Sequence, residues 1–128
     1  MNFPMSKVLT FQQLWPKMKD QIMPIQLAYK LSRLYDSVDN NARFYSTELN
    51  KIVSEYAERD AEGNIVPSED GTGVQLQKAY IPKAEAAVND LLNLMVDVPD
   101  ISFTLDELKD IKLSLEEFGI LLPFIKTE

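Results

Sequence analysis

The sequence predicts a mainly helical α+β protein: a long antiparallel helical hairpin with a small β-hairpin at its tip and a short mixed C-terminal cap. The first observation is a run of nine apolar or aromatic residues at unbroken 3,4 spacing, the core seam of one long coiled-coil-like helix. These residues are Ala28, Leu31, Tyr35, Val38, Ala42, Tyr45, Leu49, Ile52 and Tyr56. The second is a shorter repeat of the same spacing, at Ile81, Ala84, Val88, Leu91 and Met95. We therefore expect a single domain over residues 1–128, with the hairpin at about 24–95 and the cap at about 96–128.

The first segment predicts a brief or kinked helix. Thr10 is a candidate N-cap, and Pro16 would interrupt the helical hydrogen bonds. The apolar positions of this segment are Phe11, Leu14, Trp15 and Met18. The long helix should then run from about Pro24, a favourable first-turn position for proline, to about Arg59. At ~1.5 Å per residue it would be roughly 50 Å long, more than a compact core of this size is wide, so it must protrude or be covered by a partner helix.

The predicted partner is a second, shorter helix from about Lys78 to Leu94, with Pro82 near its start. Two turn-rich stretches, 60–64 and 67–73, lie between the helices. They flank two β-prone pieces, Ile65-Val66 and Val74-Gln75-Leu76. A tight β-hairpin at the tip of the helical hairpin is the simplest interpretation.

The C-terminal third predicts two short helices and two extended pieces. Thr104 and Ser114 are each followed three residues later by glutamate, which is the capping-box signature of a helix start. We expect Ile111–Leu113 to be extended and to pair with Ile101–Phe103. The last helix should bury one face before Pro123 ends it. The residues of that face are Phe118, Leu121 and Leu122.

Composition argues against most enzyme classes. The chain has no histidine and no cysteine, so it lacks the commonest general base, the commonest transition-metal ligand and any thiolate or disulfide chemistry. Its net charge of -7 opposes direct binding of nucleic acid and of anionic membranes. It shows no signal-peptide pattern, and no stretch approaches the ~20 apolar residues of a membrane span. We expect a protein that is not an enzyme and is not secreted by a signal peptide.

One short motif deserves weighing as a metal site. Asp60, Glu62 and Asn64 place oxygen ligands at alternate positions, as at the start of a calcium loop. An EF-hand then needs glycine at the sixth position and glutamate at the twelfth, whereas this chain has Ile65 and Gly71 there. We predict a solvated turn, and we assign no catalytic, cofactor-binding or metal-binding residues.

Aromatic residues are the best candidates for contact with another protein, because they combine large apolar area with, in Tyr and Trp, a polar group. Trp15 and Phe11 either fold back on the hairpin or dock into a partner groove. Tyr29 and Phe44 lie beside the long seam and could contact the C-terminal cap or a second chain. Tyr45 lies in the seam, where packing is the default and interface contact the alternative.

The chain resembles a family of small bacteriophage proteins of unknown function, found in tailed phages of Gram-positive bacteria. The resemblance covers most of the chain and is weakest over residues 2–19. The segments that carry it are Glu55 to Asn64, Val96 to Val98, Leu113-Ser114 and Leu122 to Ile125; the most specific positions are Tyr56, Asp60, Glu62 and Gly63-Asn64. The family implies viral origin and an α-hairpin with a small C-terminal cap, and it carries no activity to transfer.

Two functions follow as expectations. The first is a non-enzymatic interaction module, a virion, assembly or accessory component that forms homo-oligomers or joins a larger assembly. The shorter partner helix leaves part of the seam uncovered, and exposed apolar surface favours association. The second is a phage-encoded inhibitor that binds a host defence or nucleic-acid-processing protein, for which the acidic charge is suited. Either role places the protein in the host cytoplasm or the virion, with no cofactor, no membrane and no direct nucleic-acid partner.

Overall fold

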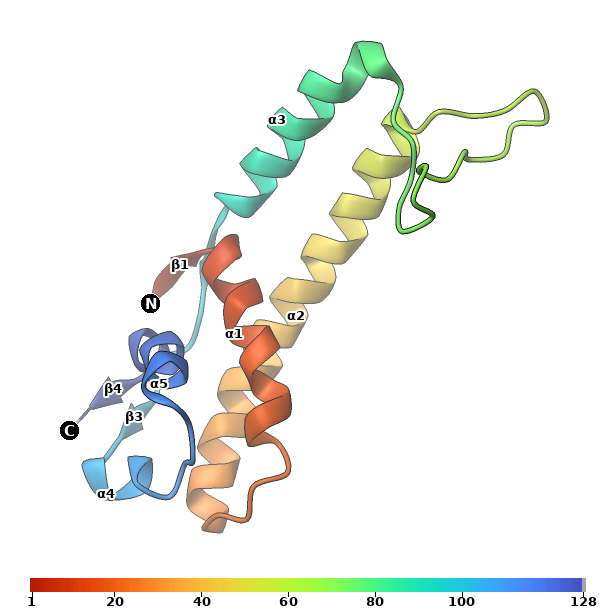
Figure 1. The fold of residues 1–128 in the computed structure, drawn as a ribbon. Helices are drawn as coiled ribbons and strands as arrows, with labels where there is room; N and C mark the ends of the chain where they lie inside the picture. The colour runs from red at the N-terminus through yellow and green to blue at the C-terminus, as the bar shows by residue number, and fades with distance from the viewer. Residues whose placement is uncertain (128) are drawn as a thin grey trace. The chain divides into compact units, whose positions relative to one another are not determined.

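The computed structural model describes residues 1–127 and shows a mainly helical α+β protein, with 59% of the chain in helices (Figure 1). The helices are α1 Met5–Met18, α2 Ile25–Tyr56, α3 Ile81–Leu92, α4 Leu105–Leu108 and α5 Leu115–Leu121, with 3-10 turns η1 Lys78–Tyr80 and η2 Leu122–Phe124. The strands are β1 Asn2–Pro4, β2 Met95–Asp97, β3 Ser102–Phe103 and β4 Lys126–Thr127. The mainly helical class and the long central helix are confirmed.

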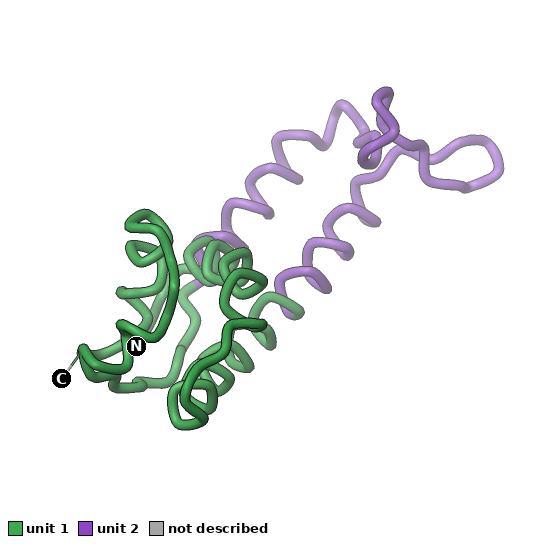
Figure 2. Tube along the Cα trace, turned by 60° about the horizontal axis from the view of Figure 1, so that its bottom comes forward, with its two compact units in different colours: residues 1–43, 95–128 green, residues 44–94 purple. Residues whose placement is uncertain are grey.

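The chain divides into two compact units (Figure 2). Unit 1 contains residues 1–43 and 95–128, and unit 2 contains residues 44–94. One boundary, at 94/95, lies next to the expected junction of hairpin and cap. The other lies inside α2, between Arg43 and Phe44, so the long helix contributes to both units.

α1 is longer than expected and begins at Met5, directly after Pro4. Thr10 is not its N-cap: the Thr10 hydroxyl donates to the Ser6 carbonyl at 3.0 Å, one turn back within the helix. Pro16 lies in the last turn, where its missing N–H removes one hydrogen bond close to the end of the helix at Met18. The expectation of a brief helix starting near Thr10 was therefore wrong.

The core of unit 1 joins α1, the first half of α2 and the C-terminal elements. Phe11 and Phe124 are buried with ring centroids 4.9 Å apart, and Phe3 stacks on Phe124 at 4.3 Å. The buried residues of α2 are Leu27, Leu31, Leu34, Val38 and Ala42. All five lie before residue 43, so the well-packed part of the seam belongs to unit 1.

Unit 1 contains two pairs of short strands, and the sequence pattern predicted neither pairing. β1 pairs antiparallel with β2, with Phe3 opposite Val96. β3 pairs parallel with β4, with Ser102 opposite Lys126. The expected pairing of Ile101–Phe103 with Ile111–Leu113 was wrong, because β4 occupies the edge of β3.

The segment between α4 and α5 is instead held by a glutamine side chain. Gln21 Oε1 accepts from the Lys112 backbone N–H at 2.8 Å, and Gln21 Nε2 donates to the Lys112 carbonyl at 2.8 Å. Both predicted capping boxes are present: Thr104 and Glu107 cap α4, and Ser114 and Glu117 cap α5. Leu121 is buried as expected, whereas Leu122 is exposed.

Unit 2 consists of the last turns of α2, a loop segment and α3. Isolated antiparallel bridges join Ala57 to Leu76, Arg59 to Ile65 and Pro67 to Val74. Two glycines at positive φ, Gly63 at 84° and Gly71 at 74°, make the turns that these bridges require. η1 and α3 together cover most of the helix expected from Lys78 to Leu94.

Candidate interaction surface

An open groove with a mostly apolar lining lies between α2 and α3 in unit 2. Its apolar lining comes from α2, from the loop before η1 and from α3: Ile52, Val53, Leu76, Ala84 and Val88. Glu85 and Asn89 of α3 complete the lining, and the volume is about 320 Å³. Figure 1 shows α3 running beside the last turns of α2 within this unit. We call this feature the α2–α3 groove.

Helical spacing explains why these side chains share one surface. Ala84 and Val88 are four residues apart on α3 and therefore project from the same face. Ala84 is buried at 3% exposure and is small, so it lets the floor of the groove lie close to the α3 backbone. Val88 and Ile52 are only half-buried. Unit 2 thus has aligned apolar side chains without a layer to cover them.

The two halves of α2 differ in burial: residues of the first half are buried in unit 1, whereas those of the second half are not buried in unit 2. No described residue of α2 after Ala42 is buried, although Tyr45, Leu49, Ile52 and Tyr56 continue the same seam. Within residues 44–94 the buried hydrophobic residues are Ala57, Ala84 and Leu91. The second half of the seam is therefore half-solvated.

The surface of unit 2 is acidic. Residues 44–94 contain nine acidic and four basic residues, a net charge of -5 out of the -7 of the whole chain. Lys51 pairs with Glu48 at 3.0 Å, and Arg59 donates to the Gly63 and Ser54 carbonyls. Two of the four cations are thus held by groups of their own unit, which leaves the acidic excess facing outward.

Carboxylates of the loop between α2 and α3 stabilise turns. Asp60 Oδ1 accepts from the backbone N–H groups of Glu62 at 2.9 Å and Asn64 at 3.0 Å. Asp70 accepts from the Ser68 hydroxyl and the Thr72 N–H, and these hydrogen bonds lower the pKa of Asp70 to about 2. Residues 1–127 contain no group of three or more side chains arranged to hold a metal ion.

The five aromatic candidates are not brought together. Phe11 is fully buried against Phe124, which is the packing alternative left open by the sequence. Trp15 is half-buried and stacks on Tyr35, with ring centroids 4.3 Å apart and an interplanar angle of 11°. Both side chains are therefore engaged within unit 1.

The remaining candidates keep accessible area. Tyr29 is 64% exposed in unit 1, with the Arg33 guanidinium 6.0 Å from its ring centroid. Phe44 is 48% exposed and Tyr45 is half-buried, both at the start of unit 2. None of the five lines the α2–α3 groove.

Sequence reasoning found the groove only in part. Ile52, Ala84 and Val88 belong to the two 3,4 repeats, whose spacing predicts a buried seam between the helices. Val53 lies next to Ile52 and outside the repeat, and Leu76 lies in a β-prone piece. The feature of the sequence that points to the groove is the unequal length of the two repeats. It predicts that part of the seam on the long helix is left uncovered, but not which part.

Two ion pairs of unit 1 join side chains of different helices. Lys30 Nζ lies 2.8 Å from Glu107 Oε1 and 5.4 Å from the Phe103 ring centroid. The hydrogen bond from Lys30, with the Thr104 backbone N–H, lowers the pKa of Glu107. Lys17 does the same for the pKa of Glu117. These contacts join α2 to α4 and α1 to α5 within unit 1.

Comparisons with protein-family models, curated proteins and solved structures found no match. Among the described helices, none is both long and apolar enough to cross a bilayer.

Proposed function

We propose that the protein is a non-enzymatic protein–protein interaction module whose contact surface is the α2–α3 groove. The observation that supports this most directly is the half-solvated apolar lining of unit 2, whereas the part of α2 that belongs to unit 1 is well buried. Contiguous exposed apolar surface rimmed by polar residues is typical of interaction sites. In this proposal α2 and α3 act as a helical hairpin, with residues 57–77 as its β-hairpin tip.

The size of the groove favours a reversible contact. Completing the burial of an aliphatic side chain that is already mostly buried contributes at most about 1 kcal/mol. The four half-buried lining residues would therefore contribute at most about 4 kcal/mol, with a similar amount from the partner. These are Ile52, Val53, Leu76 and Val88. Association costs about 4 kcal/mol or more, so the groove alone supports weak to moderate affinity.

The biological setting that we propose is a bacteriophage, with the protein acting as a virion, assembly or accessory component. The resemblance described above supports it. The groove would be covered either by a second copy of the chain or by another phage or host protein. The protein would act in the host cytoplasm or in the virion.

A second candidate is an inhibitor of a host protein with a basic surface. The acidic loop between α2 and α3 favours it, because opposite charge speeds association and selects partners. The acidic residues of this loop are Glu58, Asp60, Glu62, Glu69 and Asp70.

The test compares affinity purifications of the native chain, Val88→Asp and Leu115→Asp from phage-infected cells. Leu115 is 90% exposed on unit 1 and serves as the matched control. We expect a stoichiometric partner, or a second copy, with the native chain and Leu115→Asp only. Co-purification with phage particles favours the virion role, and a host protein eluted by salt favours inhibition. Equal recovery with all three proteins would contradict the proposal.

A further inference from the structure

We infer that the α2–α3 groove binds an amphipathic helix of a partner protein, with an apolar stripe flanked by lysine or arginine. This inference rests on the proposed function and adds the chemistry of the partner. Helix-in-groove recognition places apolar anchors at i, i+3 or i+4 and i+7 in a hydrophobic groove. A groove of about 320 Å³ is at the lower end of the size range of ligand pockets, which suits a few anchoring side chains.

The form of the groove suits an elongated apolar ligand. Its walls come from two helices, with Ile52 and Val53 on α2 and Ala84 and Val88 on α3. Such a surface has no row of free backbone donors and acceptors to pair with an added strand, because the backbone groups of both helices are used internally. A helix satisfies its own backbone and offers side chains alone, so it matches this lining best.

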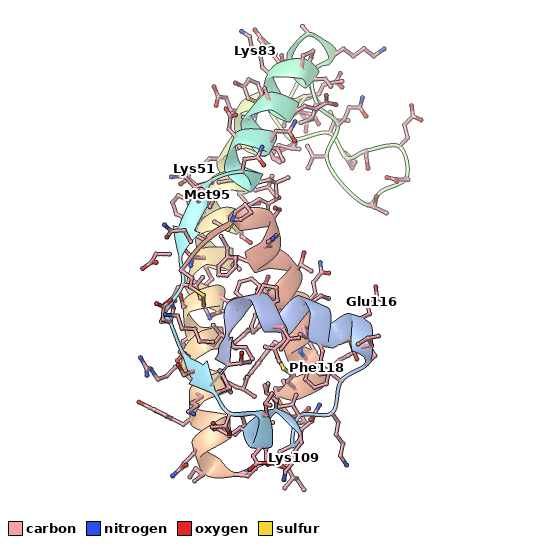
Figure 3. The ribbon with its side chains drawn as sticks, turned by 90° about the vertical axis from the view of Figure 1, so that its left-hand side faces the viewer. Lys51, Lys83, Met95, Lys109, Glu116 and Phe118 are labelled. Atoms are coloured by element: carbon pink, nitrogen blue, oxygen red, sulfur yellow. The ribbon has the colours of Figure 1, made fainter. Side chains whose placement is uncertain are left out.

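The rim determines the charge of the partner. Glu85 lines the groove. Glu85 is exposed and takes part in none of the ion pairs of residues 1–127. Lys51 is paired with Glu48, and Lys83 Nζ lies 5.6 Å from the Tyr80 ring centroid. Figure 3 shows Lys83 near the start of α3 and Lys51 on α2.

Charge complementarity therefore favours a basic partner over a second copy. Each copy would bring the same net charge of -5 on unit 2 to the interface. A two-fold interface apposes the same surface patch of both subunits, so this acidic excess would face itself. Lysines that flank a helical apolar stripe would instead meet the carboxylate of Glu85 and the net negative charge of unit 2.

The experiment titrates labelled synthetic peptides with the full chain and measures fluorescence anisotropy. One peptide is an amphipathic helix with a leucine stripe and lysine flanks. The second has the same stripe with glutamate flanks, and the third contains the residues of the first in scrambled order. We expect the first peptide to bind about fivefold or more tightly than the glutamate-flanked one, and more weakly at high salt, since one or two exposed ion pairs distinguish the two. The scrambled peptide should also bind more weakly than the first, because it keeps the charge but presents no continuous apolar stripe.

Two variants locate the binding. Val88→Asp should lose the lysine-flanked peptide, and circular dichroism checks that it remains folded. Glu85→Lys changes an exposed residue and should weaken the lysine-flanked peptide while strengthening the glutamate-flanked one. Leu115→Asp, the unit 1 control, should bind like the native chain.

The remaining outcomes separate this inference from the proposed function. Equal or tighter binding of the glutamate-flanked peptide, lost in Val88→Asp, would overturn the basic partner and keep the interaction module. The scrambled peptide binding as well as the first would show non-specific attraction and overturn the inference. Concentration-dependent dimerisation lost in Val88→Asp, without peptide binding, would assign the groove to a second copy. A strictly monomeric chain that binds no peptide and retains no cellular partner would overturn both.

Discussion

Replacing Phe11 by alanine tests whether α1 is core or a docking element. Phe11 is fully buried, and its ring lies against Phe124 at 4.9 Å between centroids. Deleting the ring leaves a cavity of roughly 100 Å³, which at about 24 cal/mol per Å³ costs about 2.4 kcal/mol, and the lost transfer free energy adds about 2 kcal/mol. We expect Phe11→Ala to lower the free energy of unfolding by about 4 kcal/mol.

The matched control is Phe44→Ala. Phe44 is 48% exposed on α2, so alanine there removes about 1 kcal/mol of burial and regains roughly 0.5 kcal/mol of helix propensity. Urea denaturation followed by circular dichroism at 222 nm measures both changes. For a chain of this size the melting temperature should fall by roughly 12–20 °C for Phe11→Ala and by only about 2 °C for Phe44→Ala. A cost below about 1 kcal/mol for Phe11→Ala would refute the packing of α1 described above and return Phe11 to the docking alternative.

Three further changes test unit 1. Gln21→Ala should lower the free energy of unfolding by about 1–2 kcal/mol, because it removes the hydrogen bonds to Lys112; Gln13→Ala, at an exposed position on α1, should not. Thr104→Ala should cost about 1 kcal/mol through loss of the α4 cap, and Thr104→Ser should restore it. The pKa of Glu107 is lowered in the folded chain, so stability from this group is present above its ordinary value of 4.5 and is lost as pH falls through the folded pKa. Urea midpoints should therefore drop below about pH 4.5, less steeply in Glu107→Gln.

Each of these three has a clear contrary result. Gln21→Ala unfolding at the same urea concentration as Gln13→Ala would mean that the side chain does not hold the α4–α5 segment. Serine failing to replace Thr104 would assign its effect to the methyl group rather than to capping. A pH dependence unchanged in Glu107→Gln would place the acid sensitivity in other carboxylates, such as Asp100, whose pKa is lowered by Lys126.

Local patterns predicted α2 and the caps of α4 and α5, but not the start of α1. The 3,4 repeat predicted α2 within a few residues at each end, because apolar residues recur every three or four positions along the whole length of an amphipathic helix. Thr104 and Ser114 indicated two helix starts, since a capping box involves residues only three apart. Pro16 does not shorten α1, because proline near the end of a helix removes only one hydrogen bond, and the buried face of α1 offsets this loss.

Local sequence patterns could not predict which distant strands pair with each other. β3 pairs with Lys126–Thr127 and β1 with Met95–Asp97, and such short strands have too few residues for alternation to specify a partner. The same limit applies to the site. Phe11 and Phe44 are equally apolar in sequence, and only the tertiary arrangement buries one and exposes the other. The 3,4 repeat likewise marks the seam of α2 without telling which half is covered.

The central claim is that the α2–α3 groove is a protein-binding surface. Methyl NMR of the isotopically labelled chain, titrated with the lysine-flanked amphipathic peptide, tests it most directly. We predict chemical-shift changes at the methyl groups of Ile52, Val53, Leu76 and Val88, with those of Val38 and Leu121 in the unit 1 core unchanged. Shifts confined to exposed unit 1 residues such as Ile25 and Leu115, or no shifts at saturating peptide, would contradict the account.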